Sequence, residues 1–268
     1  MNFDTVKLVY FSPTKTTQKI LEWIAEGVEV NSVERLDLTP PEAKRGALVQ
    51  TNDELVLLGV PVYEGRVVPE AIPRLRRLKA DKTPAVIVVL YGNREYEDAL
   101  LELNDLAREL GFSPVAGGAF IGEHSFANES RPMANGRPDT EDMKKAKEFG
   151  SKILKKMKEI DSVDEVPQLE VPGNRPYIER DHGMLREKSP STKDEICTLC
   201  GTCSALCPVA AITVEDNVKT DQSACILCCA CVKNCPTGAR AVEDPQLNRI
   251  ANWVSRNYQT RKEPETFL

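Results

Sequence analysis

Residues 197–208 read CTLCGTCSALCP, and residues 225–236 read CILCCACVKNCP. Both stretches place four cysteines in the order C-x2-C-x2-C-x3-C and follow the last cysteine with a proline. The chain has nine cysteines in all, and the remaining one, Cys229, lies beside a cysteine of the second stretch. The 196 residues before Cys197 contain none. Such a dense group indicates metal binding, because a disulfide framework usually spreads its bridges along a chain.

The spacing within the two cysteine strings is typical of bacterial ferredoxins, in which the fourth cysteine of each string binds the cluster of the other string. On that rule one [4Fe–4S] cluster takes Cys197, Cys200, Cys203 and Cys235, and a second takes Cys225, Cys228, Cys231 and Cys207. Structural zinc is the alternative, but zinc favours separate CxxC pairs, and a four-cysteine string that ends in proline fits it poorly. We expect Cys229 to be a small buried residue rather than a reactive thiol.

Residues 1–160 alternate short apolar runs with helical patterns. The strands are expected at Val6–Phe11, Val33–Leu38, Leu55–Val60, Ala85–Tyr91 and Val115–Ile121. The helices are expected at Thr17–Val28, Pro69–Leu78, Asp98–Leu110 and Thr140–Ile160. This alternation predicts an α/β fold with a doubly wound, five-stranded parallel sheet covered by helices on both faces. A sheet of this kind binds ligands at the carboxyl ends of its strands.

The turn after the first expected strand is rich in hydroxyl groups. Ser12, Thr14, Thr16 and Thr17 surround Lys15, where the first helix opens. Backbone N–H groups and hydroxyls at a helix N-terminus suit a phosphate, although three threonines are equally compatible with a plain helix cap. The segment matches neither the dinucleotide pattern G-x-G-x-x-G nor the P-loop, so the sequence shows no site for NAD(P)H.

With this turn, the N-terminal region resembles a flavodoxin, whose phosphate loop is a Ser/Thr-rich turn after the first strand. Lys15 stands where flavodoxins usually have glycine. The resemblance implies the strand order 2-1-3-4-5 and a site for FMN. It also implies flavin-binding loops after two strands, formed by Pro61, Val62, Tyr63, Glu64 and Gly65 and by Tyr91, Gly92, Asn93, Arg94 and Tyr96. Tyr63 and Tyr96 either stack on the flavin ring or simply pack these loops.

Residues 161–190 lose periodicity and are rich in proline, so we expect a linker there. The expected order is an FMN domain at 1–160, this linker, a small α+β ferredoxin domain at 191–245, and a C-terminal helix and tail at 246–268. The whole arrangement resembles the flavodoxin–ferredoxin fusion proteins of anaerobic bacteria and archaea. The linker string PGNRPY at 172–177 is part of that resemblance.

The composition narrows the function. A net charge of −6 gives no support to nucleic-acid binding. No apolar run approaches the roughly 20 residues of a membrane helix, and no signal peptide is visible, so we expect a cytoplasmic protein.

The resemblance implies a carrier that passes single electrons between two [4Fe–4S] clusters and FMN and that docks transiently with redox protein partners in anaerobic metabolism. The alternative is an enzyme, a reductase whose clusters feed FMN, which then reduces a small molecule such as a quinone, a flavin or oxygen. His124, after the fifth expected strand, is either a proton donor near the flavin or a solvated loop residue. The sequence leaves the choice between carrier and enzyme open.

Overall fold

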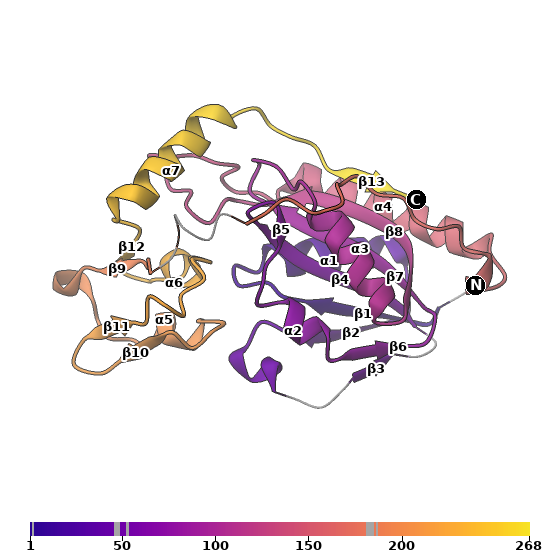
Figure 1. The fold of residues 1–268 in the computed structure, drawn as a ribbon, viewed down its shortest axis with the longest axis horizontal. Helices are drawn as coiled ribbons and strands as arrows, with labels where there is room; N and C mark the ends of the chain where they lie inside the picture. Colours follow the sequence, from indigo (N-terminus) through magenta and orange to yellow (C-terminus); the bar gives the residue numbers. More distant parts are fainter. Residues whose placement is uncertain (2, 46–48, 52–53, 181–184, 186) are drawn as a thin grey trace.

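The computed structural model describes residues 1, 3–45, 49–51, 54–180, 185 and 187–268. A sheet with helices on both faces makes up the larger part of the molecule (Figure 1). The cysteine-rich lobe, residues 191–245, lies beside one end of that sheet, with the helix α7 (Pro245–Asn257) above it. No helix in the described part of the chain is long and apolar enough to cross a membrane.

The main sheet has the order β13-β8-β7-β4-β1-β2, and the short strand β5 (Arg66–Val67) pairs with β4. Its parallel strands are β1 (Thr5–Tyr10), β2 (Ser32–Asp37), β4 (Leu55–Tyr63), β7 (Thr83–Tyr91) and β8 (Phe112–Ile121). In chain order these five strands are arranged 2-1-3-4-5, which confirms the flavodoxin-like topology. The central strand β7 is buried along its whole length because helices cover both faces.

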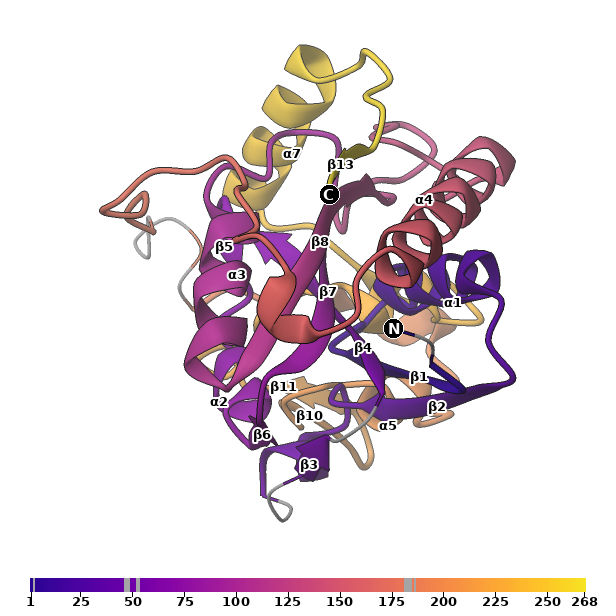
Figure 2. The same cartoon turned by 90° about the vertical axis from the view of Figure 1, so that its right-hand side faces the viewer.

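Two pairs of helices form the outer layers (Figure 2). The helices α1 (Thr16–Val28) and α4 (Thr140–Lys158) cover one face, and α2 (Ile72–Leu75) and α3 (Ala99–Glu109) cover the other. Alternate residues of β1 enter the two cores, since side chains of a strand point to opposite faces. Leu8 packs in the core with Ile24 and Phe149, whereas Val9 packs in the core with Leu103.

The helix expected at Pro69–Leu78 is shorter in the structure. It is reduced to α2, because Pro73 is tolerated only in the first turn and Leu78 already belongs to a strand. That strand, β6 (Leu78–Ala80), pairs with β3 (Val49–Thr51) in a separate small parallel sheet.

The cysteine-rich lobe contains two short antiparallel pairs, β9 (Ser191–Thr192) with β12 (Arg240–Ala241) and β10 (Ile212–Val214) with β11 (Val218–Thr220). Its helices α5 (Thr202–Ala205) and α6 (Ala230–Lys233) occupy matching places in the two cysteine strings. Gly201 precedes α5 and Cys229 precedes α6, both with a left-handed backbone. The remaining short helices are η1 (Pro41–Lys44), η2 (Val163–Glu165) and η3 (Asp194–Ile196).

The linker lies along α3 where the structure describes it. Asp98, which is fully buried, accepts the backbone N–H groups of Asn174 (2.7 Å) and Ile178 (2.6 Å). Burial acts to raise the pKa of Asp98, but these donors outweigh it and leave the pKa below its ordinary value. Arg175 also pairs with Asp105 at 2.6 Å. Residues 181–184 and 186 of the linker lie outside the described residues.

The C-terminal segment was expected to be a helix and a tail, and it forms one further strand. The strand β13 (Glu265–Phe267) returns to the sheet as an antiparallel edge beside β8. Asn93 fixes the segment that leads from α7 into β13. Its side-chain amide donates to the carbonyls of Tyr258 (2.8 Å) and Thr260 (2.9 Å). After the cysteine-rich lobe, the chain therefore returns to the main sheet and pairs with it.

The two helices on one face touch through their backbones. A Cβ on Gly150 of α4 would lie 2.1 Å from the carbonyl oxygen of Ile24, and a Cβ on Gly27 of α1 would lie 2.0 Å from that of Lys147. Alanine in place of glycine normally stabilises a helix by about 0.5–1 kcal/mol. We expect Gly150→Ala instead to lower the free energy of unfolding by about 1–3 kcal/mol, because the helices must move apart. Denaturant unfolding measures this, with the exposed Lys155→Ala as a near-neutral control. A Gly150→Ala variant as stable as the wild type would contradict the close contact.

Candidate cofactor sites

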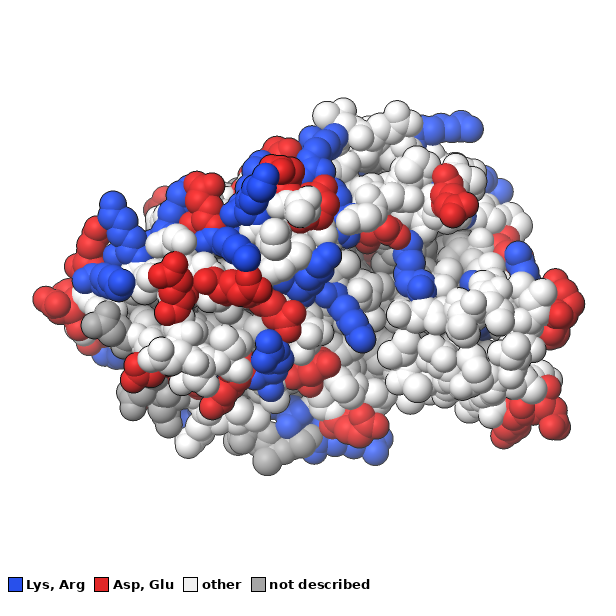
Figure 3. Space-filling model, turned by 180° about the vertical axis from the view of Figure 1, so that it is seen from behind, with Lys and Arg blue, Asp and Glu red and all other residues white. Residues whose placement is uncertain are grey.

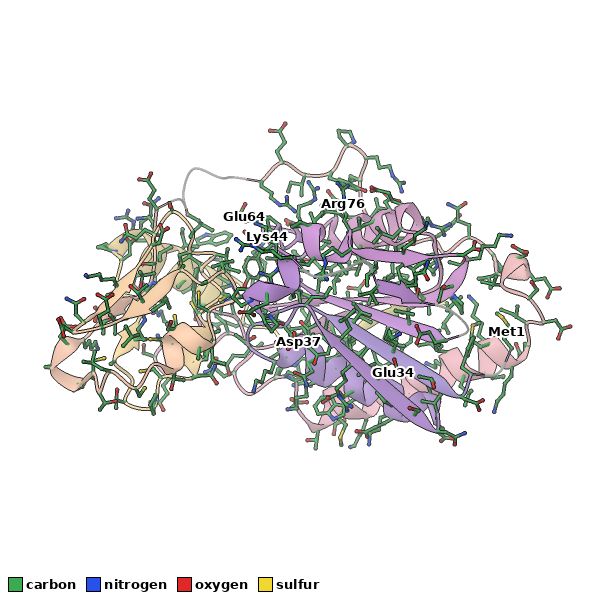
Figure 4. All side chains as sticks on the ribbon, turned by 90° about the horizontal axis from the view of Figure 1, so that it is seen from below. Met1, Glu34, Asp37, Lys44, Glu64 and Arg76 are labelled. Atoms are coloured by element: carbon green, nitrogen blue, oxygen red, sulfur yellow. The ribbon has the colours of Figure 1, made fainter. Side chains whose placement is uncertain are left out.

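The carboxyl ends of the parallel strands face the cysteine-rich lobe. Asp37, the last residue of β2, lies nearer to the lobe than Glu34, and Glu64, in the turn after β4, lies at the boundary (Figure 4). A cavity of about 720 Å³ occupies this boundary, and we call it the junction cavity. Its walls come from the loops after β1, β4, β7 and β8, from the linker, and from residues 222–227 of the lobe. The volume is within the usual range for cofactor sites.

Most of the residues expected to bind flavin line the junction cavity. Twelve of the fifteen do so: Ser12, Thr14, Thr16, Thr17, Pro61, Val62, Tyr63, Glu64, Gly65, Tyr91, Gly92 and Arg94. The three that do not are Lys15, Asn93 and Tyr96.

One end of the junction cavity offers donors for a phosphate. The helix α1 begins at Thr16 without an acidic residue in its first turn, and its N-cap residue Lys15 makes no side-chain cap. Ser12 accepts the N–H of Gln18 at 3.1 Å, while the hydroxyls of Thr14 and Thr16 lie 3.2 Å apart beside the start of the helix. Lys15 has a φ of 63°, the left-handed conformation that glycine adopts freely, and its side chain is exposed. The donor set therefore fits an anionic group.

The other end is shaped by two turns. Glu64 and Gly65 form a two-residue hairpin turn between β4 and β5, with φ values of 54° and 75°. At the second turn, a Cβ on Gly92 would lie 2.5 Å from the ring of His124, so only glycine lets the loop after β8 approach this closely. Burial raises the pKa of Tyr63 well above its ordinary value, and the nearby Cys228 and Cys229 add to the rise. Tyr63 thus stands on the side of the cavity that faces the second cysteine string.

Tyr96 and Asn93 are corrections to the expected flavin loops. The ring of Tyr96 packs on Tyr91, with centroids 5.4 Å apart, and its hydroxyl donates to Glu265 of β13 at 2.9 Å. Asn93 likewise directs its amide to the carbonyls of Tyr258 and Thr260. Both side chains hold the C-terminal segment instead of facing the cavity.

Several cavity residues were missed from the sequence. They come from the loop after β8, from the linker and from the lobe, and include Glu123, Ser125, Phe126, Arg180, Leu185, Glu187, Gln222, Ser223, Ala224, Ile226 and Leu227. Cys225 was assigned to a cluster alone, yet it lines this cavity too. No local pattern marks these residues, because only the docking of the lobe on the sheet brings them together.

His124 also lines the junction cavity and is partly buried, so it is not a solvated loop residue. The pKa of His124 is lowered to about 4, mainly by burial and also by the positive charges of Lys233 and Arg94. Its Nδ1 accepts the backbone N–H of Phe126 at 3.1 Å. A neutral imidazole that accepts at Nδ1 carries its proton on Nε2, so His124 is a hydrogen-bond donor at neutral pH.

The eight paired cysteines surround two small cavities. Cys197, Cys200, Cys203 and Cys235 line one of them and form the outer quartet. Cys207, Cys225, Cys228 and Cys231 line the other and form the inner quartet. These sets match the two that the spacing predicts, including the exchanged fourth cysteine. Four sulfurs arranged around each of these voids suit a bulky iron–sulfur cluster.

Cys229 also lines the inner cavity but differs from the quartet. It is 1 % exposed and packs in an apolar group with Phe126 and Leu247. Burial raises the pKa of its thiol well above the ordinary value. Burial also raises the pKa of Cys231, but there the guanidinium of Arg240, 3.8 Å from the sulfur, opposes the rise. Cys229 is thus a packing residue, as its position beside Cys228 suggests.

The inner quartet adjoins the junction cavity. Cys225 lines both the junction cavity and the inner cysteine cavity, and so does its neighbour Ile226. The outer quartet lies farther out, since Cys200 is exposed and Cys197 and Cys235 are only partly buried. The three sites are therefore arranged in series.

Comparison with known proteins agrees with the two-part construction. Residues 189–248 match a family model described as a 4Fe-4S dicluster domain. A search of curated proteins gave no match.

Several solved structures overlap the N-terminal part. A flavodoxin from the domain Archaea has 16 % identity and a TM-score of 0.37, covering 57 % of this chain and 99 % of that one. An FMN-bound flavodoxin of Fusobacterium nucleatum has 15 % identity and a TM-score of 0.38, covering 58 % and 97 %. The apo form of an NADH:FMN oxidoreductase has 15 % identity and a TM-score of 0.42, covering 57 % and 89 %. The flavodoxin-like fold rests on the strand order of the sheet and not on these scores.

The exchanged ligands make a comparative prediction. Cys235→Ala should abolish the same paramagnetic signal as Cys200→Ala, because both residues line the outer cavity. Cys207→Ala should instead abolish the same signal as Cys228→Ala. Electron paramagnetic resonance of the reduced variants measures this, and Cys229→Ala should keep both signals. If Cys235→Ala behaved like Cys228→Ala, the exchange would be wrong.

The low pKa of His124 predicts that its imidazole stays neutral at mildly acidic pH. With a folded pKa of about 4 against an ordinary 6.5, His124 should remain neutral at about pH 5.5. The folded state binds fewer protons, so the stability that depends on this residue is present above pH 6.5 and is lost as pH falls toward 4. Nitrogen-15 spectroscopy of the imidazoles tests this, and since the chain has two histidines, His124→Gln assigns the resonance. Titration of His124 near 6.5 would contradict its burial.

Proposed function

We propose that this chain is an electron-transfer protein that holds FMN in the junction cavity and one [4Fe–4S] cluster in each cysteine quartet. It passes single low-potential electrons between the clusters and FMN and exchanges them with redox protein partners. The observation that carries the proposal is Cys225, which lines the junction cavity and the inner cysteine cavity together. One ligand of the inner cluster is then part of the wall around the flavin.

The residues of the junction cavity fit FMN. The N-terminus of α1 and the hydroxyls of Thr14 and Thr16 suit its phosphate. Gly65 and Gly92 line the same cavity, and Tyr63 offers an aromatic wall. FMN accepts electrons singly or in pairs, which is what a partner of one-electron clusters needs.

In this proposal, redox protein partners dock beside the outer quartet and exchange electrons there. Cys200 is exposed, and the neighbouring Ile196 and Leu199 are each 43 % exposed. Ile196 and Leu199 are among the five most exposed large hydrophobic side chains in the described ranges, and each lies next to an outer ligand. Figure 3 shows mostly uncharged surface over the lobe from that side, while charges of both signs are mixed over the larger part. Such a surface suits a transient, largely apolar contact.

A reductase is the second candidate. The observation that favours it is His124, a neutral hydrogen-bond donor on the wall of the junction cavity. A small planar acceptor placed against the flavin would find a proton source there.

Anaerobic purification and analysis test the cofactors. We expect about eight irons with equivalent sulfide, and about one FMN, per chain. Zinc in place of iron and sulfide would refute the clusters, and iron without flavin would refute the junction site.

Kinetics test the order of the sites. Loss of the outer cluster through Cys200→Ala should slow reduction of FMN by a protein donor, but not by a small mediator that enters the junction cavity. Equal rates with the protein donor would contradict the series arrangement. Multiple turnovers with a quinone, free flavin or oxygen that fall in His124→Gln would favour the reductase over the carrier.

A further inference from the structure

A buried arginine lies between the two cysteine quartets. Arg240 begins β12 opposite Thr192 of β9, and it is 4 % exposed. It lines both the outer and the inner cysteine cavity, and it is the only described residue that lines both. The residue is therefore placed against both quartets at once, with its guanidinium 3.8 Å from the sulfur of Cys231 in the inner one.

The charge of Arg240 has no carboxylate partner in the described part of the chain. Its nitrogens donate to the hydroxyls of Thr192 (2.7 Å) and Thr220 (3.0 Å) and approach the sulfur of Cys231 at 3.8 Å. Its Nε is buried without a hydrogen-bond partner among the described residues. Arg137, another deeply buried arginine, is paired with Asp142, whereas the buried Arg74 has carbonyl acceptors. Burying a cation with only neutral acceptors is costly, so an anion beside Arg240 would stabilise it.

The internal repeat of the lobe shows that the arginine is not required by the fold. Arg240 follows the last cysteine of the second string, Cys235, by five positions. The residue at the matching place after Cys207 is Ile212, which is buried and lines the inner cavity. An apolar side chain thus satisfies the same position in one copy, and a cation occupies it in the other.

We propose that Arg240 is a counter-ion shared by the two clusters and that it raises the reduction potentials of both. This inference rests on the clusters of the proposed function. Each thiolate-bound cluster gains one negative charge when it is reduced, and a fixed positive charge nearby favours that state. Net charge and hydrogen bonds to sulfur are the terms by which a protein tunes such a cluster. Because Arg240 reaches both cavities, its removal should move both potentials in the same direction.

Three variants separate charge from shape. Arg240→Gln keeps a polar side chain without the charge, Arg240→Ile introduces the residue type of the first copy, and Arg240→Lys keeps the charge. The matched control is Lys219→Gln, which removes one charge from an exposed position of the same lobe. Iron and sulfide are measured first on the full chain, and each cluster is then titrated anaerobically by electron paramagnetic resonance.

In Arg240→Gln and Arg240→Ile, the ratio of reduced to oxidised cluster at a fixed potential should fall about tenfold or more for both clusters, which is a shift of about 59 mV for one electron. Arg240→Lys should retain most of the wild-type potential, and Lys219→Gln should match the wild type. If both clusters were loaded and their potentials unchanged in Arg240→Gln, the proposal would be overturned.

Cluster loading gives a second readout. Loss of iron in Arg240→Gln and Arg240→Ile but not in Arg240→Lys would support the counter-ion, because the charge alone would then be needed to hold the clusters. Loss of iron in all three variants would overturn it, since shape would be decisive. A wild-type chain without iron and sulfide would instead refute the proposed function itself.

Discussion

The position of the cysteine-rich lobe depends on the attachment of the chain to the larger part on both sides of it. Before the lobe, Asp98 binds the linker at Asn174 and Ile178. After the lobe, β13 joins the sheet beside β8. Between them, the buried Arg74 donates to the carbonyl of Pro208 at 2.5 Å, next to a cysteine of the inner quartet. These contacts hold Cys225 against the junction cavity, on which the serial arrangement of the three sites rests.

Arg74 and Arg240 show two uses of a buried guanidinium. Arg74 donates to the carbonyls of Leu38 and Thr39 as well as Pro208, so it joins the two parts of the molecule through neutral acceptors. Burial lowers its pKa, while nearby acidic residues, Glu70 foremost, oppose that. Arg240 is placed instead between sulfurs and threonine hydroxyls. One residue type thus serves assembly at the boundary and electrostatics inside the lobe.

Features that depend on the spacing of nearby residues could be predicted from the sequence. The cysteine quartets follow from the spacing within two strings, the alternating elements predict a parallel sheet, and the resemblance to flavodoxins implies the order of its five strands. Patterns could not reveal where the C-terminal segment returns, so Tyr96 and Asn93 were assigned to flavin although they hold β13 and its approach. The place of Arg240 is likewise visible only in three dimensions, because β12 must pair with β9 before the side chain lies between the quartets.

The exchange of the fourth cysteines has a consequence for how the protein matures in the cell. Each quartet takes three members from one string and one from the other, so the inner quartet is complete only after synthesis through Cys231 and the outer one only after synthesis through Cys235. A nascent chain that ends between the strings has three cysteines of the outer quartet and one of the inner. Neither string can therefore complete a quartet by itself, and on the proposed function both clusters would have to wait for the second string.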